Sequence, residues 1–265
     1  SPEAIAQRLS RARQTLRDTY DEFALADNDV AVRLPSALEA LYLLFSEGYN
    51  AHSGDRLIRE ELCAEALRLT GSLLTHKRAA TPEVEALLAL MLFQAARLST
   101  RVGAEGVPVL LDQQDRSRWD RALINEGFDH LQRSITDSAP TRYHLQAGIA
   151  AAHAAAQRYE DTDWDLILRY YDDLLALDQS PVIAVNRAVA LARAQGAAAG
   201  VRALRELLEQ PFVERFHLYW VALGDLQREL GDAESARECY EKALTLVSVE
   251  PERRLLEWKL AGLNI

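Results

Sequence analysis

The chain of 265 residues contains little cysteine and no long apolar run. Its two cysteines, Cys63 and Cys239, lie far apart and no C-x-x-C pair occurs, which excludes a disulfide framework and a thiolate metal site. No apolar stretch approaches the roughly 20 residues that span a bilayer, and the opening S-P-E-A-I-A-Q-R is no apolar signal segment. We therefore expect a soluble, cytoplasmic protein without a membrane partner.

Motifs for common catalytic and cofactor sites are also missing. The sequence contains no P-loop, no G-x-S-x-G elbow and no G-x-G-x-x-G turn, and its six histidines show no metal-ligand spacing. The densest polar run, 112–126, holds Asp112, Asp115 and Asp120 among arginines, but one helix would spread these groups around its circumference. We therefore favour a structural polar network there over an acid–base site. The sequence predicts no enzyme activity, no cofactor, no metal and no small-molecule ligand.

Helical periodicity fills almost the whole chain, which predicts an all-α fold. The expected helices lie at about 35–47, 56–75, 82–98, 114–134, 141–157, 164–177, 181–194 and 198–209. The helix after Thr81 is apolar on all its sides, so we expect it to be central and buried. Gly48 is a natural C-cap for the first of these helices. Only residues 101–111 suggest strands, as a small β-hairpin that turns at Gly106.

The last third of the chain matches the tetratricopeptide (TPR) pattern. Small residues at three positions let two antiparallel helices approach, and two aromatic side chains fill the groove between them. The matching positions are Trp220, Leu223, Gly224, Gly231, Ala236, Tyr240 and Ala243. The match is incomplete, because Gln227 stands where an aromatic residue is usual. We expect a solenoid of antiparallel helix pairs, with a helical domain at 35–160 and degenerate TPR-like repeats at 161–265 packed on it.

Charge is unevenly distributed along the chain. The formal net charge is −10 at pH 7, which argues against binding of nucleic acid or an anionic membrane by most of the chain. Residues 1–17 nevertheless hold four arginines against one glutamate, a net charge of +3, so the other 248 residues carry −13. Apolar residues recur every third or fourth position in this segment, which predicts a basic amphipathic helix. Residues 19–34 lack sustained periodicity and are expected to form a linker.

Two features of the sequence form a series of motifs. Residues 8–17 read R-L-S-R-A-R-Q-T-L-R. The rest of the chain contains, in order, L-Y-L-L-F-S-E-G-Y (41–49), L-C-A-E-A-L-R-L (62–69), L-L-A-L-M-L-F-Q-A-A-R (87–97), Q-D-R-S-R-W-D (114–120), T-D-W (162–164) and S-P-V-I-A-V-N-R-A-V-A (180–190). The first feature resembles the R-L-x-R-A-R-x-x-L-R signature that ends the helix-turn-helix of region 4 in bacterial extracytoplasmic-function sigma factors, and the series resembles the C-terminal TPR domain that some of them carry. The resemblance covers essentially the whole chain, although Ser46 stands where the family pattern has asparagine.

The resemblance implies a transcription initiation factor whose partners are core RNA polymerase, sigma regions 2 and 4, and promoter DNA. Residues 1–18 are then the last helix of region 4, and the earlier parts of the sigma factor are implied to precede them. The implied promoter-contacting residues in this helix are Glu3, Gln7, Arg8 and Arg11. The implied family-motif residues, which we expect to take part in interactions, are Asp115, Arg116, Trp119, Asp120, Trp164, Asn186 and Arg187.

The extension at 35–265 is expected to regulate the sigma factor in cis, in place of a separate anti-sigma protein. Its negative charge suggests that it masks the basic helix, although an acidic surface that only keeps the protein soluble is the simpler interpretation. A different class of function also fits the residues. A free-standing TPR-like adaptor would bind a peptide in a concave groove.

Overall fold

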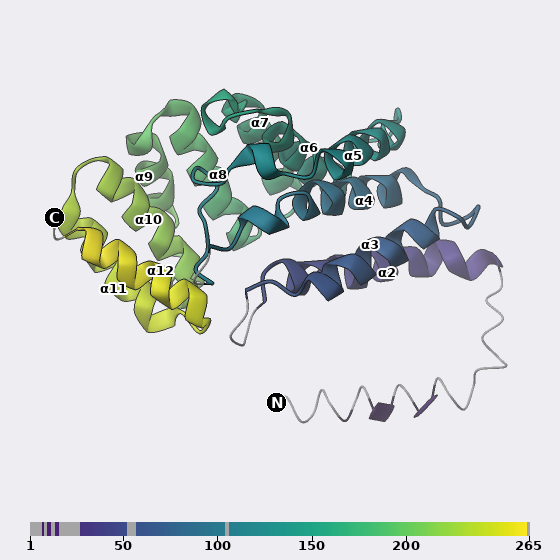
Figure 1. Cartoon of the computed structure of the whole chain (residues 1–265), viewed down its shortest axis with the longest axis horizontal. Helices are drawn as coiled ribbons and strands as arrows, with labels where there is room; N and C mark the ends of the chain where they lie inside the picture. The colour runs from purple at the N-terminus through teal and green to yellow at the C-terminus, as the bar shows by residue number, and fades with distance from the viewer. Residues whose placement is uncertain are drawn as a thin grey trace.

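The computed structural model describes residues 27–51, 57–103 and 106–263, together with the isolated positions 7, 10, 11, 14 and 15. This part of the chain is all-α, with eleven α-helices, short 3-10 turns and no strand. The α-helices are α2 (Asp27–Tyr49), α3 (Glu60–Leu73), α4 (Pro82–Ala95), α5 (Arg121–Ser134), α6 (Arg142–Ala155), α7 (Trp164–Leu177), α8 (Pro181–Gln195), α9 (Ala197–Glu206), α10 (His217–Glu229), α11 (Ala233–Leu246) and α12 (Glu250–Gly262). They follow one another around an arc, from α2 and α3 at one end to α11 and α12 at the other (Figure 1).

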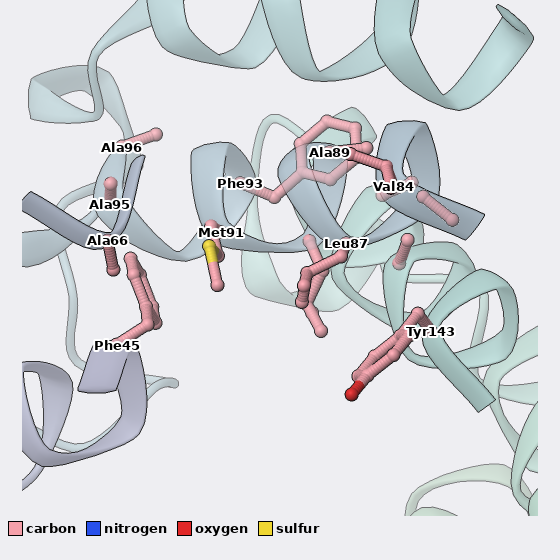
Figure 2. Close-up of a cluster of buried hydrophobic side chains, with 14 of the residues drawn as sticks. Phe45, Ala66, Val84, Leu87, Ala89, Met91, Phe93, Ala95, Ala96 and Tyr143 are labelled. Atoms are coloured by element: carbon pink, nitrogen blue, oxygen red, sulfur yellow. The ribbon is translucent and has the colours of Figure 1, made fainter. Parts of the chain in front are cut away.

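Helix α4 is the central element of the first half, as its apolar circumference predicts. Ten of its fourteen residues are buried, and it packs against α2, α3, α5 and α6. Figure 2 shows Leu87 and Met91 on the side of α4 that faces Phe45 and Tyr143. Despite the apolarity of α4, no helix in the described ranges has both the length and the hydropathy that crossing a bilayer requires.

The second half consists of helix pairs in which each helix packs mainly on its neighbours in the chain. Contacts join α7 to α8, α8 to α9, α9 to α10, α10 to α11 and α11 to α12. In the α10–α11 pair, a Cβ atom placed on Gly224 would lie 2.6 Å from Cε1 of Tyr240, so only glycine permits this approach. Gly231 forms the turn between the two helices with a φ of +82°, a conformation that glycine adopts without strain.

The predicted β-hairpin at 101–111 is wrong. Among the described residues of this segment no strand forms, and a single antiparallel bridge joins Val102 to Pro108. Gly106 does lie in a turn, with a φ of +76°, and its amide donates to the carbonyl of Gly103. The amide of Arg101 donates to the carbonyl of Leu98 in the preceding 3-10 turn, and the turn at Gly106 closes the other side, so the pairing is limited to this one bridge.

Helix α2 begins earlier than predicted, because part of the expected linker at 19–34 is helical. The helix begins at Asp27 and contains Pro35 in its interior. Val30, Leu34 and Leu38 recur every fourth residue and pack in the first core. The apolar stripe at this end of the helix is short and lies among polar residues, which is why sequence periodicity missed it.

Helix α2 packs closely on α3, which requires a glycine at position 48 and buries Cys63. Gly48 lies inside α2 rather than capping it, and a Cβ atom there would lie 2.8 Å from Sγ of Cys63. Cys63 on α3 is 1% exposed and Cys239 on α11 is 6% exposed. Burial raises the pKa of each thiol to about 11, so both stay protonated at neutral pH.

The predicted helix at 114–134 is divided in two. Residues Arg116–Arg118 form a 3-10 turn, η3, and α5 begins only at Arg121. The Asp115 carboxylate accepts hydrogen bonds from the amide and hydroxyl of Ser117, and the Asp120 carboxylate accepts from the amides of Ala122 and Leu123. The two acids therefore cap two successive elements, each by satisfying amides that the helical ladder leaves unpaired.

Candidate functional site

A pocket of about 330 Å³ lies where α4, α6, α7 and α8 face the segment that leads into α5. This volume is within the range of sites that hold small molecules. Much of its wall is aromatic: Tyr42, Phe93, Trp119 and Tyr171. Five polar side chains also line it: Gln94, Arg97, Gln146, His153 and Asn186. The pocket thus combines an apolar wall with a few hydrogen-bonding groups, which is the usual composition of a ligand site.

Helical spacing brings the polar groups together. Gln146 and His153 are seven residues apart on α6, about two turns, so they lie on the same face of that helix. Gln94 lies in the last turn of α4, and Arg97 follows two residues after that helix ends. Asn186 on α8 lines the same pocket. Three segments that are distant in sequence therefore each contribute one or two polar side chains.

Arg116 fixes one side of this site. Its side chain is buried, and it donates to the carbonyls of His153 (2.9 Å) and Ala156 (3.1 Å) at the end of α6 and to Oγ1 of Thr162 (3.1 Å). A guanidinium at a helix C-terminus compensates carbonyls that the helix leaves without partners. Burial is the main cause that lowers the pKa of Arg116, followed by the positive charge of Arg97. Arg116 therefore anchors η3 to the connection between α6 and α7.

Two guanidinium groups lie close to the ring of Trp119. Its ring centroid is 5.0 Å from Cζ of Arg116 and 5.5 Å from Cζ of Arg97, within the range of cation–π contacts. The indole Nε1 donates to Oγ1 of Thr100 at 3.0 Å, which fixes the orientation of the ring. Nε of Arg97 donates to Oε1 of Gln114 at 3.2 Å. The arginine beside the pocket is therefore held in place by neutral groups.

Two buried polar atoms at the pocket have no hydrogen-bond partner within the described residues. They are Nδ1 of His153 and Oε1 of Gln146. The pKa of His153 is lowered to about 3, first by burial and then by the positive charges of Arg97 and Arg116, so its imidazole is neutral near pH 7. Buried polar atoms without partners are costly and are therefore rare. A bound molecule that contacts both atoms would remove this cost.

The structure separates the predicted family-motif residues into two groups. Trp119 and Asn186 line the pocket, and Arg116 supports it from behind. Trp164 begins α7 and makes an edge-to-face contact with His153, with ring centroids 5.2 Å apart. The other three residues serve structure: Asp115 and Asp120 are caps, and Arg187 forms an ion pair with Asp172.

The residues expected to contact DNA are only partly described. Gln7 and Arg11 are helical and exposed. Glu3 and Arg8 lie outside the described residues. The carbonyl of Arg11 accepts a hydrogen bond from Oγ1 of Thr15 at 3.0 Å, which is a contact along one helical turn.

The predicted TPR residues meet between α10 and α11. Ala236, Tyr240 and Ala243 are fully buried on α11, while Leu223 and Gly224 are buried on α10. Nε1 of Trp220 donates to the carbonyl of Val213 at 2.9 Å. The Tyr240 hydroxyl donates to Oδ1 of Asp225 at 2.6 Å, and the buried Lys259 of α12 forms an ion pair with the same carboxylate. This network connects the TPR-like pair to α12.

Sequence reasoning missed four polar residues of the pocket: Gln94, Arg97, Gln146 and His153. A signal existed for the first two, because they are polar residues at the end of a helix that is otherwise apolar on all its sides. No sequence motif marks His153, because none of the six histidines shows metal-ligand spacing. Nothing in the sequence shows that α4 and α6 pack together and that both line a cavity.

Two parts of the chain match known families. Residues 33–135 match a family of unknown function (DUF6596), and residues 218–246 match the tetratricopeptide repeat. The first match covers most of α2 through α5, and the second covers α10 and α11. The TPR match indicates a protein-interaction function. Neither description names a sigma factor, so that part of the prediction stays a proposal.

One uncharacterized protein is similar to almost the whole chain. An uncharacterized protein of Rhizobium meliloti (strain 1021) is 36% identical over 261 residues, which is 98% of this chain and 61% of the relative. The chain therefore spans about three fifths of the length of that relative. The similarity extends beyond the two family matches, so it includes α6 to α8, which form half of the pocket.

Proposed function

We propose that this chain is the regulatory, protein-interacting extension of a bacterial extracytoplasmic-function sigma factor. The observation that carries the proposal is the combination of a basic segment like the end of region 4 with a TPR-containing helical array. Gln7 and Arg11 are exposed helical positions in that segment, as a DNA-contacting face requires. The ordered series of motifs from 41 to 190 supports the same assignment.

In this proposal the array controls promoter-specific initiation through contacts with the sigma regions or with core RNA polymerase. Stacked helix pairs present extended surfaces that suit protein partners. The array is acidic and the segment at 1–17 is basic, so their charges would favour an intramolecular contact. That contact would weaken as ionic strength rises, because salt screens exposed charges.

We also propose that the array has no catalytic role. The run at 112–126 held the strongest candidates for acid–base chemistry, yet Asp115 and Asp120 are occupied as caps. In the ranges that the structure describes, no group of three or more His, Cys, Asp or Glu side chains could hold a metal ion. A double variant, Asp115→Ala with Asp120→Ala, is expected to lose stability rather than an activity.

Promoter-specific transcription in vitro tests the proposed function. Purified core polymerase would be combined either with the longer protein that includes sigma regions 2 and 4 or with a version that ends near Asp21. We expect truncation to change the transcript yield, downward if the array is a required positive element and upward if it is a built-in inhibitor. Promoter-independent synthesis by the same polymerase is the control. Equal yields would contradict regulation in cis.

The salt dependence of the same assay tests the masking hypothesis separately. If the acidic array covers the basic helix, truncation raises the yield, and the increase becomes smaller as the salt concentration is raised. An increase that is independent of salt would contradict masking, although it would leave regulation in cis intact.

The second candidate function is a TPR-like adaptor that binds a peptide. The TPR match over α10 and α11 favours it. The two functions differ in their partner: the adaptor would bind an extended peptide from an unrelated protein, and neither core polymerase nor the sigma regions would compete with that peptide. Competition by either of them would favour the sigma-factor assignment.

A further inference from the structure

The pocket between α4, α6, α7 and α8 differs in charge from the rest of the molecule. The chain carries a net charge of −10, yet the pocket is lined by one arginine and by no aspartate or glutamate. A second guanidinium, that of Arg116, lies 5.0 Å from the ring centroid of Trp119. Within the described ranges, the hydrogen bonds of both arginines go only to neutral oxygens. Arg97 therefore places at this cavity a positive charge that no acid of the described residues pairs with, whereas the charge of Arg116 is also felt by Glu160 and Asp161.

We propose that this pocket binds a small organic carboxylate that carries an apolar body and a hydroxyl group. The proposal goes beyond the regulatory function proposed above and does not depend on it. It replaces the sequence-based expectation that the chain has no small-molecule ligand.

Arg97 is the group that would hold the carboxylate. A guanidinium has five N–H donors, and among the described residues only Nε of Arg97 has a hydrogen-bond partner, Gln114. The remaining donors can form the paired hydrogen bonds that arginine makes with a planar carboxylate. His153 lies in the same pocket with Nδ1 unpaired, and as a neutral imidazole it can donate one further hydrogen bond.

Gln146 is the group that would accept a hydrogen bond from the ligand hydroxyl. Its Oε1 is a buried acceptor to which no described residue donates, and a second carboxylate oxygen there would be repelled rather than bound. A ligand hydroxyl supplies the missing donor and removes the desolvation penalty. The ligand therefore needs one anionic end and one neutral donor close to it.

The remaining walls and the volume define the rest of the ligand. Tyr42, Phe93, Trp119 and Tyr171 offer aromatic surface to an apolar or aromatic body. A volume of about 330 Å³ is at the lower end of the range for drug-sized ligands. A nucleotide or another polyanion is disfavoured, because a single arginine lines the cavity.

Fluorine NMR on the full chain tests the proposal with three probes. 4-Fluoromandelate carries a carboxylate, a hydroxyl and an aromatic ring; 4-fluoromandelamide lacks the charge; and 4-fluorophenylacetate lacks the hydroxyl. We expect saturable binding of 4-fluoromandelate, with binding of the uncharged amide at least roughly tenfold weaker, because a hydrogen bond to a charged group is lost. 4-Fluorophenylacetate should bind between the two.

Two variants assign the binding to the pocket. Arg97→Gln should weaken 4-fluoromandelate binding by roughly tenfold to a hundredfold. Ala150→Leu, which adds volume to the wall while keeping Arg97, should also weaken it, and this variant separates binding from any instability caused by losing the arginine. Arg118→Gln is the matched control, because Arg118 is exposed on η3 and does not line the pocket.

Several outcomes would overturn the proposal. Absence of saturable binding by 4-fluoromandelate, equal binding of acid and amide, or equal losses in Arg97→Gln and Arg118→Gln would each do so. If 4-fluorophenylacetate binds as tightly as 4-fluoromandelate, the role of Gln146 is wrong. A hexapeptide that ends in phenylalanine and binds more tightly than the small acid would assign the pocket to a protein C-terminus instead. None of these results depends on transcription, so they leave the proposed function untouched.

Discussion

The two halves of the molecule bury their apolar side chains in different ways. Most buried residues of α2 to α6 form one large cluster around α4. The remaining buried residues are divided among three smaller clusters, each made by adjacent helices, and one of them joins Leu145, Ile149 and Ala152 of α6 to α7 and α8. A central helix connects many neighbours at once, whereas in a repeat array each pair depends mainly on the next pair. The first half is therefore expected to unfold as one unit and the second half to open locally.

The largest effect is expected from a cavity in the first core. Leu87 is completely buried on α4, so Leu87→Ala should lower the free energy of unfolding by about 2–5 kcal/mol. Hydrogen exchange should accelerate in α2 to α6 together, because these helices share the cluster. Leu177→Ala on α7 is the control, since Leu177 is 59% exposed and should change stability by less than about 0.5 kcal/mol. Acceleration confined to α4 would contradict a single cooperative core.

A smaller and more local effect is expected in the array. Gly224→Ala places a Cβ atom against the Tyr240 ring, and such overpacking should cost about 1–3 kcal/mol. Amide exchange should accelerate in α10 and α11 while the amides of α4 keep their protection. Gly262→Ala on α12 is the matched control, because its Cβ atom would meet nothing within 4 Å. Equal acceleration in both halves would show that the array is not locally independent.

The smallest effect concerns His153, at the junction of the two halves. Its pKa is lowered from 6.5 to about 3 by burial and by Arg97 and Arg116, so the unfolded chain binds a proton more readily than the folded one. The folded state accommodates only the neutral imidazole, so His153 does not lower the free energy of unfolding above pH 6.5. As the pH falls from 6.5 toward 3, the free energy of unfolding decreases by at most about 1.4 kcal/mol per pH unit.

Urea unfolding at pH 7 and pH 5 measures this loss. Wild type should lose up to about 2 kcal/mol more than His153→Gln between these two values. His76→Gln, at an exposed turn position, should behave like wild type. If wild type and His153→Gln show the same acid dependence, His153 does not limit the stability of the junction.

Much of the fold could be predicted because it depends on local patterns. The apolar circumference of the helix after Thr81 indicated its central position, and the spacing from Trp220 to Ala243 indicated the α10–α11 pair. Errors arose where a tertiary contact decides the local structure. The sequence suggests Gly48 as a helix end, but it lies inside α2, where only a glycine leaves room for the close approach of Cys63. The pairing at Val102 stops after one bridge because the amide of the neighbouring Arg101 donates to Leu98 instead.

The candidate site could be predicted only in part. Trp119 and Asn186 belonged to sequence motifs, and the structure shows both at the pocket. Gln146 and His153 carry no motif, and their importance depends on burial and on missing hydrogen-bond partners, which only three-dimensional packing determines. Arg116 belonged to a motif as well, but its hydrogen bonds to the end of α6 depend on a contact across some forty residues of sequence.

The burial of Cys63 and Cys239 has a consequence for labelling experiments. Maleimides and similar reagents are attacked by the cysteine thiolate, and both native thiols have a pKa of about 11 and little accessible surface. A single cysteine introduced at an exposed position would therefore react far faster than either native thiol. Labels can therefore be attached to chosen helices without first removing the native cysteines. With two introduced cysteines, one on α2 and one on α12, energy transfer between two dyes would report the spacing between these helices.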